Sequence, residues 1–259
     1  MSGLFLLSTW AINFIPYEIQ EKVFEKSNNL NGNNDGAAMV KMVVGDKPYA
    51  FPKVWQATAD VSSFLLVIAG LIMIIVVTNE YSFKTHRQNI IDGLSRTQFI
   101  MVKLADGLVI AVVSTVWVIL TALFFGFYEG HTSLSFENFH YIFYFFLQAL
   151  SYCWLAVLFG ILFKRSGIAI GVFFLYTIIL ENAIAAILNR VLPESFFMRG
   201  SGNYLPIESS DQLMPFPAFE AIQRQLGTPV NITVQLVLVF AYLVAYFMIS
   251  KRRFETADL

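Results

Sequence analysis

Residues 78–103 read TNEYSFKTHRQNIIDGLSRTQFIMVK, and this basic amphipathic stretch lies between two apolar runs of membrane-spanning length. The runs cover about 58–78 and 105–127. A hydrocarbon core about 30 Å thick needs roughly 20 apolar residues of helix. The pattern therefore predicts two transmembrane helices joined by a connector, residues 79–104, at one membrane surface.

The composition of the whole chain is also that of a membrane protein. Hydrophobic residues make up 57% and charged residues 14% of the sequence, whereas soluble domains contain roughly 45–50% and 25%. The apolar runs are continuous, unlike the alternating strands of a membrane barrel. We therefore predict an all-α polytopic membrane protein of about six transmembrane helices, with residues 1–259 forming a single transmembrane domain. The predicted spans are 3–16 (shortened), 58–78, 105–127, 139–163, 168–189 and 231–250.

The first span and the two outer loops are less regular. The apolar run at 3–16 is short for a crossing, and a signal peptide is the alternative, although the run lacks a basic start and a small-residue cleavage site. The loop at 17–57 contains an Asn/Gly-rich tract typical of flexible chain. The loop at 190–230 mixes aromatic residues with prolines, which favours short interfacial or re-entrant helices.

Lys and Arg near the span ends predict the orientation. Nine of the 17 basic residues fall in the connector, in the pair Lys164-Arg165 and in the run Lys251-Arg-Arg253, whereas the short loop 128–138 has none. These three basic segments are expected to be cytoplasmic. Six spans with both termini in the cytoplasm satisfy this bias. Five spans with the amino terminus outside would place the same loops in the cytoplasm.

Several functions are disfavoured by the residues that the chain contains. A net charge of −1 without a basic stripe carrying aromatic residues argues against nucleic acid as a partner. The single Cys153 permits no internal disulfide. His86, His131 and His140 are expected near the membrane surfaces, so they form no metal-binding or catalytic group at depth. The sequence predicts no enzyme activity and no cofactor in this chain.

The connector can be divided into local elements. Phe83, Ile90 and Ile91 recur at helical spacing, which predicts a short amphipathic helix at about 81–92. Gly93 provides the permissive backbone that ends such a helix. Ser95-Arg-Thr-Gln98 then fits a capping box, in which Ser95 and Gln98 bond each other's backbone at the start of the next helix. We expect a rigid helix-turn-helix that transmits a push into both adjoining spans.

These residues resemble the loop between the second and third spans of type 2 ABC exporter permeases. In that family a Glu, a Gly-Thr pair and a Ser-Arg followed by a Lys mark the coupling region to the ATPase. The six-span layout and the long last outer loop, with its Tyr204-Leu-Pro206, are similar too. The sequence departs from the pattern at Lys84, which replaces the small Gly, and by lacking the interfacial helix that precedes the first span. That second departure is expected of an incomplete start or a shortened first span.

The resemblance implies a bacterial inner-membrane protein that works as half of a transporter. Its partners would be two ABC ATPase subunits, a second permease copy or a related permease, and membrane lipids. ATP and Mg would be bound by the ATPase subunits, and the chain itself contains no phosphate-binding G-x-x-x-x-G-K-[ST] loop. The coupling residues carried over are Glu80, Thr85, Arg87, Ile91, Gly93, Ser95, Arg96 and Lys103. Alternatively, the basic residues anchor lipid headgroups, and Glu80 pairs with Lys84 along its own helix.

Glu181 is the one acidic residue expected deep inside a span, where a charge must be paired or hydrated, whereas Asp60 and Asp106 are expected near span ends. Helical spacing predicts that it shares a face with Gly171 and Phe174, and Asn182 follows it directly. We predict that Glu181, Asn182 and Gly171 line a substrate pathway or a dimer seam. The alternatives are a carboxyl that is hydrogen-bonded within the bundle and an ion-coupled transporter or channel that uses Glu181.

Overall fold

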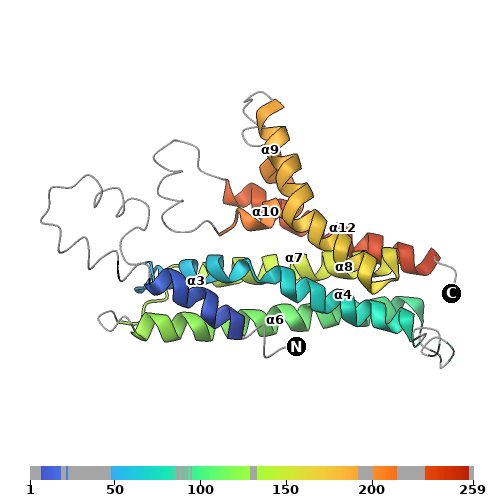
Figure 1. Cartoon of the computed structure of the whole chain (residues 1–259), viewed down its shortest axis with the longest axis horizontal. Helices are drawn as coiled ribbons and strands as arrows, with labels where there is room; N and C mark the ends of the chain where they lie inside the picture. The colour runs from blue at the N-terminus through green and yellow to red at the C-terminus, as the bar shows by residue number, and fades with distance from the viewer. Residues whose placement is uncertain are drawn as a thin grey trace, which may run out of the picture. The chain divides into compact units, whose positions relative to one another are not determined.

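In the computed structural model every element of the described residues is helical (Figure 1). The structure describes residues 7–18, 22, 48–83, 85, 88, 91, 93, 95–128, 133–191, 201–214 and 231–256. No strand occurs among them. This confirms the predicted all-α class.

Four of the described helices are long and apolar enough to cross a membrane. They are α6 (Arg96–Tyr128), α7 (His140–Phe163), the run formed by α8 (Ser166–Leu175), η1 (Tyr176–Leu180) and α9 (Glu181–Val191), and α12 (Ile232–Thr256). A fifth crossing results if α3 (Val54–Ser63) and α4 (Leu66–Ser82) together form one span. Residues 7–18 are also helical, but this segment is shorter than a full crossing.

The span predicted at 58–78 is not one continuous helix, because α3 ends at Ser63 and α4 begins at Leu66. The Ser63 hydroxyl donates to the Asp60 carbonyl at 2.7 Å, and the Leu65 amide bonds Ser62 only three residues back, at 3.1 Å. Such local bonds compete with the α-helical ladder. Hydropathy does not register this break, because Phe64 and Leu65 are themselves apolar.

The described chain divides into two compact units. The first comprises Met1–Leu65, Ser114–Phe145 and Met214–Asn231. In it, buried Asn13 donates to Ser62 Oγ at 3.0 Å and accepts from the Tyr49 hydroxyl at 3.4 Å, which fastens the helix of residues 7–18 to α3. Burial, and secondarily the Asp60 carboxylate, raise the pKa of Tyr49, so its phenol stays a neutral donor. The face of this helix that carries buried Thr9, Asn13 and Tyr17 is the face that contacts protein.

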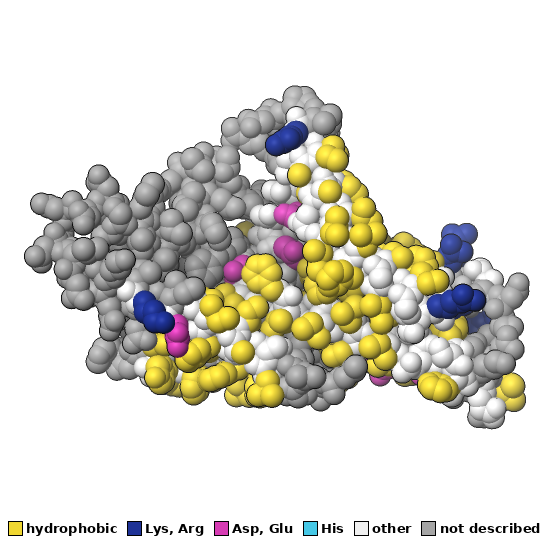
Figure 2. Space-filling view, in the orientation of Figure 1, with side chains coloured by type: hydrophobic (Ala, Val, Ile, Leu, Met, Phe, Trp, Pro, Cys, Tyr) yellow, Lys and Arg dark blue, Asp and Glu magenta, His cyan; other side chains and the backbone are white. Residues whose placement is uncertain are grey.

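The second unit contains both candidate sites. It comprises Leu66–Val113, Phe146–Leu213 and Ile232–Leu259. Close helix contacts hold it together: the Phe173 ring of α8 lies against Gly70 of α4, and Val77 of α4 lies against Gly160 of α7. A side chain at either glycine would overlap these neighbours, since interiors are close-packed. The outward side chains of α8 and α9 form a largely apolar surface in Figure 2, as expected of a helix that faces lipid.

Buried residues recur every four positions along α8, η1 and α9: Ala169, Phe173, Thr177, Glu181 and Ala185. Four residues of α-helix turn about 400°, so this spacing alone would drift around the helix by roughly 40° at each step. The π-helical turn η1 accommodates more residues in one turn and offsets part of that drift.

This register corrects the predicted face of Glu181. Gly171 is exposed, with no neighbouring atom within 4 Å of an added Cβ, and Phe174 and Ile178 are 48% and 44% exposed, whereas Glu181 is 2% exposed. Gly171 and Glu181 therefore lie on different faces. The prediction of a common face was wrong because it assumed uninterrupted α-helical periodicity.

Candidate functional site

An ion cluster joins the two helices that flank the connector. The Lys103 ammonium of α6 lies 2.5 Å from Glu80 Oε1 of α4 and 3.2 Å from Asp106 Oδ2. The Lys103 side chain is 7% exposed and that of Glu80 is 23% exposed. Glu80 and Lys103 are each candidate coupling residues in the sequence, but the sequence does not indicate that they pair.

The capping box predicted at the start of α6 is confirmed. The Ser95 amide donates to Gln98 Oε1 at 2.9 Å, and the Gln98 amide donates to Ser95 Oγ at 3.2 Å. These reciprocal bonds satisfy two donors that a helix start leaves without partners. They also fix the direction in which the connector enters α6.

Gly93 has the backbone conformation expected of the predicted stop. Its φ is +102°, which side-chain-bearing residues rarely adopt. No atom lies within 4 Å of an added Cβ. Glycine is therefore required here by backbone conformation and not by lack of space.

The first turns of α6 are also attached to the end of α12. The Arg96 guanidinium donates to the Glu255 carbonyl at 2.7 Å, and the Thr97 hydroxyl donates to Glu255 Oε1 at 2.7 Å. One turn further, the rings of Phe99 and Phe254 stack with centroids 4.7 Å apart. Sequence analysis missed Phe254 and Glu255, because nothing in the local pattern of α12 identifies their partners.

Between the end of α4 and the start of α6, the described connector residues 83, 85, 88, 91, 93 and 95 are exposed. Residues 85, 88 and 91 are helical, and the Thr85 hydroxyl donates to the Glu80 carbonyl at 3.4 Å. Phe83 and Ile91 are 76% and 78% exposed, so these two large apolar side chains of the connector make little contact with the described protein. Arg87 and Lys84 lie outside the described residues. The predicted coupling helix at 81–92 is described only at these positions.

A second polar site surrounds Glu181. Its Oε1 accepts hydrogen bonds from the backbone amides of Ile207, at 2.5 Å, and Glu208, at 2.9 Å. These amides begin the short helix α10 (Glu208–Asp211), which packs against α9 and α12 (Figure 1). The buried carboxylate thus supplies acceptors to a helix start whose amides have no helical partners. This geometry matches the hydrogen-bonded carboxyl that sequence analysis considered as an alternative.

The segment 201–214 that carries α10 is held on several sides. It begins with η2 (Ser201–Tyr204), whose Gly202 amide donates to Asn189 Oδ1 at 2.8 Å. The Tyr204 carbonyl accepts from the Tyr242 hydroxyl of α12 at 2.6 Å, and Asp211 Oδ1 accepts from Gln148 Nε2 of α7 at 2.7 Å. Short helices were predicted within 190–230, and these described residues confirm them.

Gly202 explains how η2 comes so close to α9. A Cβ at this position would lie 2.5 Å from the Ala185 carbonyl oxygen and 2.6 Å from its Cα. Only glycine permits that approach of two backbones. Together with the bonds to Glu181, it seats the segment directly on the buried face of α9.

Asn182 does not take part in this site. Its side-chain amide bonds the Ile178 carbonyl of its own helix at 3.0 Å, and the residue is exposed. Gly171 is likewise on the open surface of α8. Whether these two residues line a pathway or a dimer seam remains a prediction.

The fold and these two sites define an all-helical, multi-pass membrane protein. Several of its described polar side chains connect one helix to another, at the ends of α4, α6 and α12 and around α10. In comparisons with known proteins, no family model matches the chain and no curated protein matches it.

Proposed function

We propose that this chain is the membrane-spanning permease subunit of an ATP-driven ABC exporter, in which separate ATPase subunits dock on residues 79–104. The observation that carries the proposal is the construction of this connector. Its ends are connected by the ion pair of Glu80 and Lys103, while Phe83 and Ile91, between these two residues in the sequence, are exposed. Exposed apolar side chains on a rigid support fit the docking of another protein.

The proposed mechanism follows the connections of the helix ends. ATP-driven closure of two ATPase subunits pushes the two connectors of a permease pair. Because Lys103 joins α6 to Glu80 of α4, a push moves these helix ends together. The bonds of Arg96 and Thr97 to Glu255 pass the movement on to the end of α12. Substrate would then cross toward the outer side of a bacterial inner membrane.

Co-purification tests the proposal. We expect the tagged chain, gently extracted from its native membrane, to carry a stoichiometric soluble subunit with a phosphate-binding loop, identified by mass spectrometry. Recovery of this chain without any ATPase, even after mild crosslinking, would reject an ATP-driven permease and favour an autonomous carrier or channel.

Gly93→Ala is expected to weaken ATPase docking without preventing membrane insertion. A non-glycine residue at positive φ costs about 1–3 kcal/mol, and 1–2 kcal/mol changes an equilibrium by roughly 5–30-fold. We therefore expect the affinity of the co-purified ATPase for the permease, reconstituted in nanodiscs, to fall by about tenfold.

Gly167→Ala is the matched control, since Gly167 also has open space around its Cβ position but no positive φ. It should leave docking unchanged. Equal docking by the wild type and the Gly93→Ala variant would show that the turn at Gly93 is not part of the ATPase contact.

A further inference from the structure

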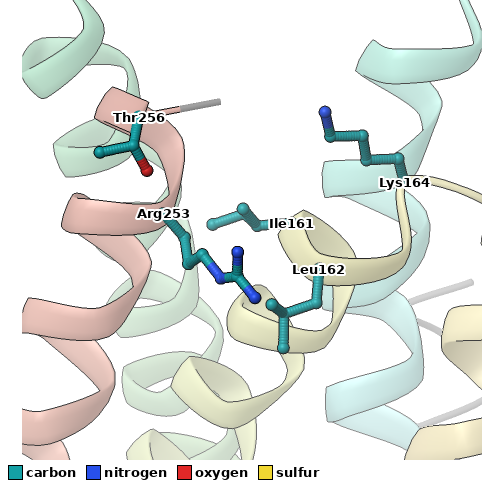
Figure 3. A pocket seen from close by; sticks show the side chains of 5 residues that line it. All are labelled: Ile161, Leu162, Lys164, Arg253 and Thr256. Atoms are coloured by element: carbon teal, nitrogen blue, oxygen red, sulfur yellow. The ribbon is translucent and has the colours of Figure 1, made fainter. Parts of the chain in front are cut away.

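A basic hollow lies where α7 and α12 end in the second unit. It has a volume of about 310 Å³ and is lined by Ile161, Leu162, Lys164, Arg253 and Thr256 (Figure 3). Both helices are membrane-crossing candidates, and the end of a crossing helix is expected near a membrane surface. Figure 2 shows basic side chains gathered near the carboxyl end of α12.

Lys164 and Arg253 are the two basic residues that line the hollow. Lys164 follows the last residue of α7 with a φ of +55°, which turns the chain sharply before α8. Its ammonium lies 5.9 Å from the centroid of the Tyr81 ring, a cation–π distance that holds the side chain near α4. Arg253 belongs to the last turn of α12. Among the described residues, neither Lys164 nor Arg253 forms an ion pair with a carboxylate.

The remaining lining restricts the chemistry of a ligand. Helix carboxyl ends present carbonyls and no free amides, so attraction for an anion must come from the two side chains. The Thr256 hydroxyl already donates to the Arg252 carbonyl at 2.8 Å, which leaves its oxygen as an acceptor. Phosphate oxygens suit Lys and Arg, and a hydroxyl next to the phosphate would suit Thr256.

The apolar part of the lining indicates which kind of molecule would carry that phosphate group. Leu162 is 39% exposed and Ile161 is buried, so aliphatic surface adjoins the two cations. Basic pockets between transmembrane helices bind the headgroups of anionic lipids. We propose that this hollow binds the phosphate of an anionic phospholipid with a hydroxylated headgroup, with its acyl chains along Leu162. This site is independent of the proposed ATPase docking.

Native mass spectrometry of the detergent-solubilised full chain tests the assignment. The chain is titrated separately with dioleoyl phosphatidylglycerol, dioleoyl phosphatidylcholine and inorganic phosphate. We expect tight binding of one phosphatidylglycerol, and about 30-fold weaker binding by the double variant Lys164→Gln/Arg253→Gln, because two cations near the headgroup are removed.

The control is Arg165→Gln/Arg252→Gln, which removes the same charge from the chain neighbours of the two pocket residues. Neither control residue lines the hollow, and Arg165 makes no side-chain cap to α8. Thermal unfolding of both double variants checks that they remain folded. The control should bind phosphatidylglycerol as the wild type does.

Each other outcome overturns the lipid assignment. If both double variants lost phosphatidylglycerol binding equally, the lipid would be attracted by the overall positive charge of this end of the protein and not by the hollow. Saturable binding of inorganic phosphate, with no preference for phosphatidylglycerol over phosphatidylcholine, would assign the hollow to a soluble phosphate. Absence of binding by all three probes would remove the site altogether.

Discussion

Lys103→Met is expected to lower the thermal unfolding midpoint of the purified chain by about 6–12 °C. The substitution keeps the length of the side chain but leaves the carboxylate of Glu80, 23% exposed, without the ammonium that lies 2.5 Å away. Removing one partner of a buried pair costs about 3–5 kcal/mol. We take about 3 kcal/mol because Glu80 retains some contact with solvent, and 1 kcal/mol corresponds to roughly 2–4 °C for a chain of this size.

A double variant separates the charge from the packing. Glu80→Gln/Lys103→Met removes both members of the pair, and the remaining Asp106 is 41% exposed and readily hydrated. Most of the lost stability should therefore return, as measured by the unfolding midpoint in the same detergent. If Lys103→Met unfolds at the wild-type temperature, the pair does not hold α4 to α6, and the proposed transmission of a push loses its basis.

The parts of the fold that local sequence determines could be predicted. Long apolar runs led to the helices of 140–163 and 232–256, because the length of an apolar segment is set by the thickness of the membrane. Gly93 and the capping box of Ser95 and Gln98 could be predicted as well, since each depends on residues within a few positions. Each of these features is produced by neighbouring residues, so it can be recognised from a short stretch of sequence.

Features that depend on distant partners could not be predicted in the same way. Glu80 has a nearer potential partner in Lys84, and only the packing of α4 on α6 brings it to Lys103. Likewise, no local pattern connects Glu181 to the amides of residues 207 and 208. The π-helical turn η1 lies between Gly171 and Glu181 and changes the angle between their side chains. Regular α-helical periodicity does not include this change, so it predicts the wrong face for Gly171.

The bonds of Glu181 bear on the choice between two classes of transporter. An ion-coupled carrier needs a carboxylate that exchanges its bound ion during transport. In this structure the carboxylate is instead a fixed acceptor at the start of α10. That role requires an oxygen at Oε1 but not a charge. The two roles therefore predict different results for a neutral residue of the same shape.

Glu181→Ala is expected to destabilise the chain by about 3–5 kcal/mol, whereas Glu181→Gln should retain most of the stability. Alanine leaves the buried Ile207 amide and the partly buried Glu208 amide without an acceptor, and a buried group without a partner costs about 1–3 kcal/mol. Glutamine keeps a carbonyl oxygen in the place of Oε1, so the amides of Ile207 and Glu208 remain bonded. The unfolding midpoint and the amount of folded chain in the membrane measure both variants.

Asn182→Ala is the matched control, since Asn182 is the next residue on α9 and bonds only the backbone of its own helix in the described structure. It should change the midpoint little. Equal destabilisation by Gln and Ala at position 181 would show that the negative charge, and not only an acceptor oxygen, is needed to hold α10. A stable Glu181→Ala chain would show that α10 does not depend on this carboxylate.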